Sequence, residues 1–177
     1  MNAKKAPTVR IDYPKHWFAI GTLIWILGTT LLIFLAYDSV EESLRAFWLV
    51  AAAFEGIVMF YLFVLPLFTY HIAGVKGLRI RMGLLIRETI PYEWISEVKE
   101  ASIHWGGVRV GVGVRYAPIM KALFVTSSFR TLVTVTLDED HRLGGLWKRP
   151  VREIVLSVNS ASSFIDVIMK RTGMEKV

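Results

Sequence analysis

Two long apolar runs lie one after the other near the amino end of this chain, and they constrain its fold more than any other feature. The first run extends from Trp17 to Tyr37 and the second from Ala46 to Tyr70, with the mostly polar segment 38–45 between them. The hydrocarbon layer of a bilayer is about 30 Å thick, and about 20 helical residues cross it. We therefore predict a transmembrane hairpin of two helices, 17–37 and 46–70.

The hairpin divides the 177 residues into three parts. Residues 1–16 form a basic lead, residues 17–70 form the hairpin, and residues 71–177 are enough for one compact domain. The chain has no cysteine, which excludes disulfides, thiolate metal ligands and a thiol nucleophile. The compartment must therefore be inferred from charge.

Lysine and arginine are distributed unevenly around the two runs. The segment between the runs has only Arg45, whereas cations gather before the first run and after the second. By the positive-inside rule, both ends of the chain are therefore cytoplasmic. The cations concerned are Lys4, Lys5, Arg10 and Lys15 in the lead, and Lys76, Arg79, Arg81 and Arg87 in the tail.

A cleaved signal peptide is the alternative interpretation of the first run. That run is longer than a usual signal core, however, and Ala36-Tyr37-Asp38 makes a poor cleavage site. We therefore predict a multi-pass protein of the cell (inner) membrane that keeps both spans.

Glu55 is the only charged residue within the second run. Its position places it about 14 Å deep, where an ionised group costs on the order of 3 kcal/mol, so it should be protonated or have a partner. In an antiparallel hairpin Gly28 and Thr29 lie at the same depth. We predict a hydrogen bond between Thr29 and Glu55 that fixes the register of the two helices.

Small residues at Gly21, Gly28, Ala52 and Gly56 should let the two helices approach closely. Two further hypotheses remain open for Glu55, namely pairing between subunits and the handling of a proton or ion. Two helices offer little wall for a transport pathway, so we favour a structural or oligomeric role and expect Glu55→Gln to be tolerated.

After Tyr70 the apolar residues alternate, which is typical of strands. Gly83 marks a turn, Pro91 interrupts the next strand, and Ser160 is a candidate N-cap for a final amphipathic helix. The apolar residues of that helix are Ala161, Phe164, Ile165, Ile168 and Met169. The predicted strands, seven in all, are 78–82, 84–90, 95–104, 108–115, 121–126, 131–137 and 152–158.

Several short stretches of the tail have the residue types of a known family. They are Tyr70-His71-Ile72, Gly77-Leu78-Arg79-Ile80, Gly83-Leu84-Leu85, Ile90-Pro91-Tyr92-Glu93-Trp94-Ile95, Leu123-Phe124-Val125-Thr126 and the ending Ile154 to Ile168. Placed after a two-helix hairpin, this pattern resembles the bacterial pleckstrin-homology-like (PH-like) membrane proteins. The resemblance implies a mainly β, seven-stranded sandwich or barrel with a C-terminal capping helix and a non-enzymatic role. Segment 138–150 has no counterpart in that pattern.

The polar residues give no pattern of a catalytic or metal site. The four histidines are not spaced as ligands on one face, and Asp138-Glu139-Asp140-His141 lacks the glycine and closing glutamate of a calcium loop. The serines lie in turn and cap positions without a candidate base nearby. We therefore predict no catalytic residues, no metal and no cofactor, and interpret 138–141 as a solvated hairpin tip.

The formal net charge of +6 favours an acidic partner. No RNA-binding motif or recognition helix is present, so we predict anionic lipid rather than nucleic acid. Arg79, Arg81 and Arg87 follow the second run closely, and Trp147, Lys148 and Arg149 resemble an interfacial anchor on a loop. Packing of Trp147 against the β domain is an equal alternative.

These observations lead to two hypotheses about function. The first is a membrane-anchored, cytoplasmic PH-like domain that serves as a protein-interaction or assembly module at the inner face, as a homo-oligomer or with a membrane protein partner. The second is an accessory subunit of a transport or export system, with Glu55 contacting a larger membrane partner.

Overall fold

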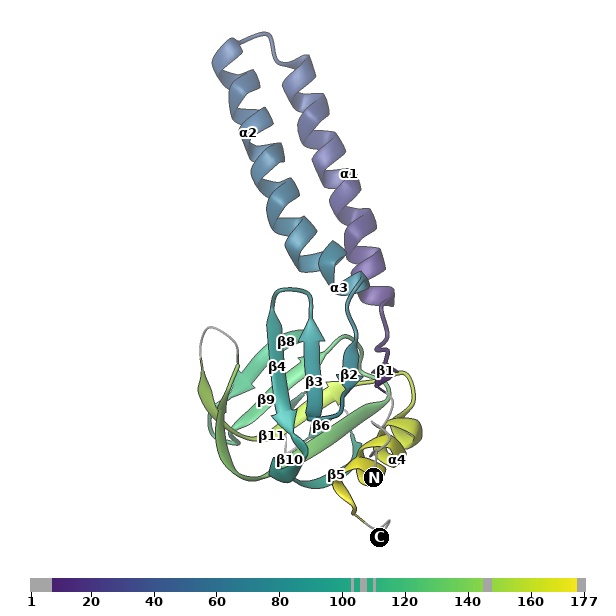
Figure 1. Cartoon of the computed structure of the whole chain (residues 1–177). Helices are drawn as coiled ribbons and strands as arrows, with labels where there is room; N and C mark the ends of the chain where they lie inside the picture. Colours follow the sequence, from purple (N-terminus) through teal and green to yellow (C-terminus); the bar gives the residue numbers. More distant parts are fainter. Residues whose placement is uncertain (1–7, 103, 106–107, 110, 145–147, 175–177) are drawn as a thin grey trace.

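Two long helices stand on one end of a mainly β domain (Figure 1). The computed structural model describes residues 8–102, 104–105, 108–109, 111–144 and 148–174. Its helices and strands agree with a two-helix hairpin followed by β sheets and a C-terminal helix.

The first helix, α1, is formed by His16–Asp38. The second begins with α2 (Glu42–Met59) and continues through η1 (Phe60–Val64) and α3 (Leu65–Leu67). Both are long and apolar enough to span a membrane, and only 6% of the most apolar window of each is buried within the protein. That exposure separates them from the core helices of a globular protein.

The π-helix η1 widens the second helix close to its end. Here the N–H of Leu65 donates to the carbonyl of Phe60, five residues earlier. Pro66 explains the change, because proline has no N–H and its ring collides with the carbonyl four residues before it. The hydropathy predicts that the second helix extends to Tyr70, but it ends at Leu67. Thr69 and Tyr70 are therefore not helical.

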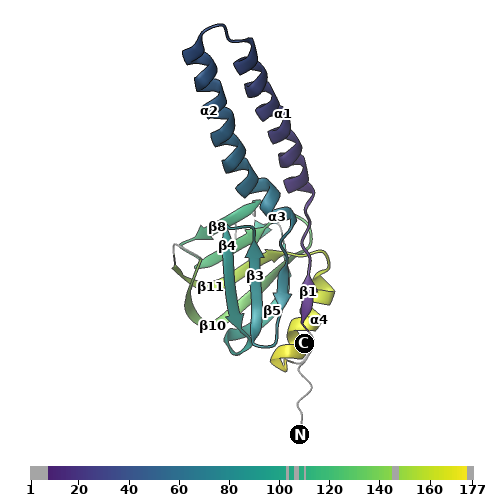
Figure 2. The same ribbon diagram turned by 45° about the horizontal axis from the view of Figure 1, so that its top comes forward.

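Two sheets form the β domain (Figure 2). The four-stranded sheet has the order β1 (Val9–Ile11), β2 (His71–Ala73), β3 (Gly77–Met82) and β4 (Ile86–Pro91). The five-stranded sheet has the order β5 (Ile95–Ala101), β10 (Leu132–Leu143), β11 (Arg149–Ser157), β9 (Ala122–Thr126) and β8 (Gly113–Ala117). A short pair, β6 (His104–Trp105) and β7 (Val108–Arg109), stands apart, and η2 (Tyr92–Trp94) joins β4 to β5.

The hydrophobic core lies between the inner faces of the two sheets. Alternate residues of β3, namely Leu78, Ile80 and Met82, are fully buried, while Arg79 between them is exposed. The final helix α4 (Ala161–Thr172) adds Phe164 and Ile168 to this core. As the sequence predicts, Ser160 caps α4, with its hydroxyl accepting from the N–H of Ser163.

The structure corrects the sequence analysis in three places. The lead is not a separate segment, because its residues 9–11 pair with β2. Segment 138–150, which has no counterpart in the family pattern, contributes strand residues, because β10 continues past a bulge to Leu143 and pairs again with Arg149 and Pro150 of β11. The single strand predicted over 108–115 is divided into β7 and β8. The described residues therefore contain more strands than the seven predicted.

Candidate functional site

The junction between the hairpin and the β domain is closely bonded. The buried Tyr13, which follows β1, donates its hydroxyl to the carbonyl of Pro66 at 2.6 Å and shares a second hydrogen bond of 2.6 Å with the Thr69 hydroxyl. Lys15 Nζ donates to the carbonyl of Leu67. The residues that enter the first helix are thereby bonded to those that leave the second.

A histidine lies behind this junction. His71 is fully buried at the start of β2, its Nδ1 accepts from the N–H of Arg81 at 3.2 Å, and its ring lies 5.1 Å from that of Tyr13. Burial lowers the pKa of His71 to about 4 and raises the pKa of Tyr13 to about 12. Both side chains are therefore neutral near pH 7.

The structure brings Thr29 and Glu55 together. Thr29 Oγ1 donates to Glu55 Oε2 at 3.3 Å. Gly28 lies beside the same carboxyl, since a Cβ built there would be 3.0 Å from Glu55 Oε1. The polar pair predicted from the depths of the two residues is thus a contact between α1 and α2.

The four small residues have different environments. A Cβ at Gly21 would overlap the ring of Phe63, so the absence of a side chain permits this helix contact. Ala52 is buried. Gly56 has open space where its Cβ would be, so the prediction that it packs against the other helix is wrong.

A groove runs between the two helices from Glu55 towards the β domain. It has a volume of about 390 Å³ and is mostly apolar. The indole N–H of Trp25 is buried there without a hydrogen-bond partner among the described residues. The groove is lined by Trp17, Ile20, Gly21, Ile24, Trp25, Gly28, Glu55, Met59 and Phe63. The groove therefore contains the unpaired indole N–H of Trp25 and the Glu55 carboxyl, of which only Oε2 accepts from Thr29.

Three predicted lipid-contact residues lie on the outer face of the four-stranded sheet. Arg81 on β3 is directly opposite Arg87 on β4, next to the β3–β4 turn. Arg79 is one step further from that turn, opposite Thr89. The three predicted cations therefore share one face of the sheet, and among them only Arg81 and Arg87 form a cross-strand pair.

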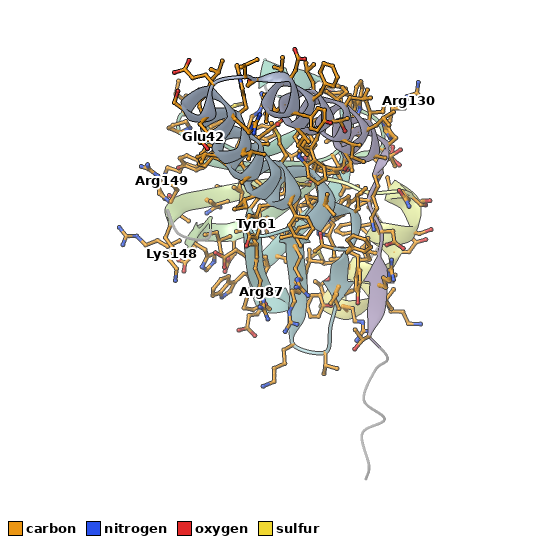
Figure 3. All side chains as sticks on the ribbon, turned by 90° about the horizontal axis from the view of Figure 1, so that it is seen from above. Glu42, Tyr61, Arg87, Arg130, Lys148 and Arg149 are labelled. Carbon is orange, nitrogen blue, oxygen red and sulfur yellow. The ribbon has the colours of Figure 1, made fainter. Side chains whose placement is uncertain are left out.

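The other predicted cations are elsewhere. Lys148 and Arg149 are exposed and lie on the opposite side of the domain from Arg130 when it is viewed along the hairpin (Figure 3). Arg149 borders a cavity of about 640 Å³ together with Arg115 and Lys121. Trp147 lies outside the described residues, so neither interpretation of its side chain is tested.

Residues 138–141 are not a hairpin tip as predicted. They belong to β10, at the bulge where its pairing shifts. The ring of His141 stacks on Trp94 at 3.8 Å, and His141 Nε2 lies 2.9 Å from Asp138 Oδ1, a hydrogen bond that lowers the pKa of Asp138. Among the described residues, no group of three or more His, Asp or Glu side chains is placed to hold a metal ion.

Sequence reasoning missed several residues at the hairpin-facing end of the domain. Tyr13, Lys15 and Thr69 connect distant segments, and no local pattern marks such contacts. Leu84 and Leu85 in the β3–β4 turn are exposed, although turns usually carry polar residues. That departure was visible in the sequence and is the signal that could have identified them.

Comparisons with protein-family models, curated proteins and solved structures give no match to this chain. The functional argument therefore depends on the chain's own geometry.

Proposed function

We propose that this chain is a non-enzymatic, membrane-anchored protein whose PH-like β domain acts as an interaction or assembly module at the inner face of a prokaryotic membrane. The observation that carries the proposal is the bonded junction of Tyr13, Pro66 and Thr69. Because this junction ties both ends of the hairpin to the β domain, the hairpin holds the domain beside the bilayer in one orientation.

The charge pattern supports the cytoplasmic location of the domain. Arg45, in the first turns of α2, is the only cation at the end of the hairpin away from the β domain, whereas Arg81, Arg87 and Arg130 lie on the β domain. The inner leaflet carries anionic lipid, which attracts cations within a Debye length of its surface. A domain held in this place presents a fixed surface to other membrane-bound molecules.

Cross-linking in native membranes followed by mild detergent extraction tests this function. The assembly module predicts a discrete complex that contains either several copies of this chain or one membrane protein partner in fixed ratio. A chain that stays monomeric in membranes and after extraction, with no partner in fixed ratio, would contradict the proposal.

The groove below Glu55 favours a second function, an accessory subunit of a transport or export system. A helix of a larger partner that offers a donor to the Glu55 carboxyl would satisfy it at a depth where water is scarce. The test is co-purification of the partner with Glu55→Gln, Glu55→Leu and, as a matched control, Gly56→Ala, which enters open space. Loss of the partner only with Glu55→Leu supports this function, while retention with all three variants removes it.

A further inference from the structure

The β3–β4 turn is held against the end of the second helix. Gly83 adopts a φ of +56°, its N–H donates to Thr69 Oγ1 at 2.9 Å, and a Cβ built on it would lie 3.1 Å from the ring of Pro66. Pro66 belongs to α3, the last helical turn. The turn therefore lies level with the end of the helix, as Figure 1 shows.

The turn exposes apolar side chains at this level. Leu84 is 70% exposed and Leu85 is 40% exposed, whereas Met82 and Ile86 on either side are buried in the core. Phe68, which follows α3, is 75% exposed. A helix that spans a bilayer ends where hydrocarbon meets the headgroups, so these three side chains would be covered by lipid.

Two arginines flank the turn. Arg81 and Arg87 are direct cross-strand partners, and like charges in such a pair repel each other unless an anion lies between them. Among the described residues neither forms an ion pair with a carboxylate, and Arg81 Nε is buried without a hydrogen-bond partner. Guanidinium groups bind phosphate through paired N–H donors.

The spacing between the leucines and the arginines fits the depth profile of a membrane. One strand residue advances about 3.3 Å and β3 ends at Met82, so Arg81 lies at most roughly 10 Å from Leu84. A headgroup layer is roughly 5–8 Å thick, and an arginine side chain extends several ångströms beyond its backbone. With Leu84 at the hydrocarbon boundary, the backbone positions of Arg81 and Arg87 lie within an arginine side chain's length of the phosphate level. Arg79 lies about 7 Å further along the strand, beyond their level.

From this arrangement we propose that the β3–β4 turn inserts Leu84 and Leu85 into the bilayer interface and that Arg81 and Arg87 together bind the phosphate of an anionic phospholipid. The inference rests on the proposed membrane anchoring and adds a defined lipid site to it. The ligand is lipid rather than free phosphate, because the apolar side chains at the turn require an acyl environment.

Insertion of the turn is testable with single cysteines, since the chain has none of its own. The full-length chain carries Leu84→Cys or the control Val75→Cys, is labelled with an environment-sensitive fluorophore, and is reconstituted in phosphatidylcholine–phosphatidylglycerol vesicles that contain spin-labelled acyl chains. Val75 is 49% exposed in the β2–β3 turn at the other end of β3. We expect strong quenching at position 84 and little at position 75, and equal quenching would overturn the insertion.

A third labelled position separates this proposal from the anchoring itself. Ile24 is 64% exposed on α1, so Ile24→Cys must be quenched if the hairpin is in the bilayer. Quenching at 24 without quenching at 84 overturns the inserted turn and leaves the anchoring intact. Absence of quenching at both positions overturns the proposed function as well.

Phospholipid retention tests the arginine pair. Native mass spectrometry of the full-length chain compares the amounts of bound phosphatidylglycerol and phosphatidylcholine. The proteins compared are the parent, the double variant Arg81→Gln/Arg87→Gln and the control Arg79→Gln. Circular dichroism first confirms that each variant is folded. Two surface cations account for a roughly 30-fold preference, which the double variant should lose and Arg79→Gln should keep. Equal loss of the preference in both variants would show nonspecific attraction. Displacement of the bound phosphatidylglycerol by inorganic phosphate would assign the site to free phosphate. Either result overturns the lipid site.

Discussion

The hairpin and the β domain of this chain bury their apolar residues in different ways. Along α1 most apolar side chains are exposed on the isolated protein, and Leu27, for example, is 64% exposed. In β3 the apolar residues Leu78, Ile80 and Met82 are fully buried between the sheets. The hairpin therefore leaves its apolar side chains uncovered by the protein, while the domain has a core of its own.

Polar contacts between side chains therefore contribute differently to the stability of the two regions. In the hairpin a single contact, from Thr29 to Glu55, is the only side-chain hydrogen bond between α1 and α2 among the described residues. In the β domain the ion pair of Lys99 with Glu97 is exposed and contributes little. The junction at Tyr13 joins the two regions.

The largest effect is expected in the core of the β domain. Leu78→Ala removes a fully buried side chain and should lower the free energy of unfolding by about 2–5 kcal/mol. The matched change Leu27→Ala, on the exposed surface of α1, should leave the unfolding of the β domain nearly unchanged. Urea denaturation of the chain in detergent micelles measures both. Equal destabilisation would show that the two regions do not differ as described.

The second effect is a loss of stability at acidic pH caused by His71. Its pKa is about 4 in the folded chain and about 6.5 when unfolded, so only the unfolded chain binds the proton between these values. Stability is therefore complete above pH 6.5 and decreases as the pH falls towards 4, by up to about 3 kcal/mol.

Denaturation curves between pH 4 and pH 7.5 measure this effect. His71→Asn retains an acceptor for the N–H of Arg81 but cannot titrate, so its stability should depend less on pH. An unchanged pH dependence in His71→Asn would assign the effect to other groups.

Loss of the junction should have a moderate effect. Tyr13→Phe keeps the buried ring and removes both hydrogen bonds of the hydroxyl, which should cost about 1–2 kcal/mol. It should also loosen the orientation of the hairpin on the domain. Pulsed electron–electron double resonance between spin labels at positions 40 and 119 should then give a broader distance distribution than in the parent chain. An unchanged distribution would show that other contacts fix the orientation.

The smallest effect is expected at Glu55. Hydrogen bonds between membrane helices contribute about 0.6 kcal/mol on average, so Glu55→Gln, which keeps the bonding capacity, should be close to neutral. Thr29→Val should cost about as much as Glu55→Leu, and the double variant no more than either alone. A double-mutant cycle in micelles measures the coupling, and additive effects would mean that the pair is not an energetic contact.

The hairpin could be predicted from sequence because composition and length alone determine whether a helix can span a bilayer. The contact between Thr29 and Glu55 also followed, since antiparallel helices place equal depths opposite each other. The pairing of Val9–Ile11 with β2 could not be predicted, because strand and partner are far apart in sequence and each has only three residues. The prediction that Gly56 packs against α1 failed because a small residue permits a contact between helices without requiring it.

Accessibility of single cysteines in intact cells tests most directly whether the hairpin spans the membrane with the β domain inside. Val40, between the helices, is 97% exposed and Ile119, in the turn after β8, is 99% exposed. We predict that a membrane-impermeant maleimide labels Val40→Cys in intact cells and labels Ile119→Cys only after permeabilisation. Labelling of both positions in intact cells, or of Ile119→Cys alone, would contradict the account.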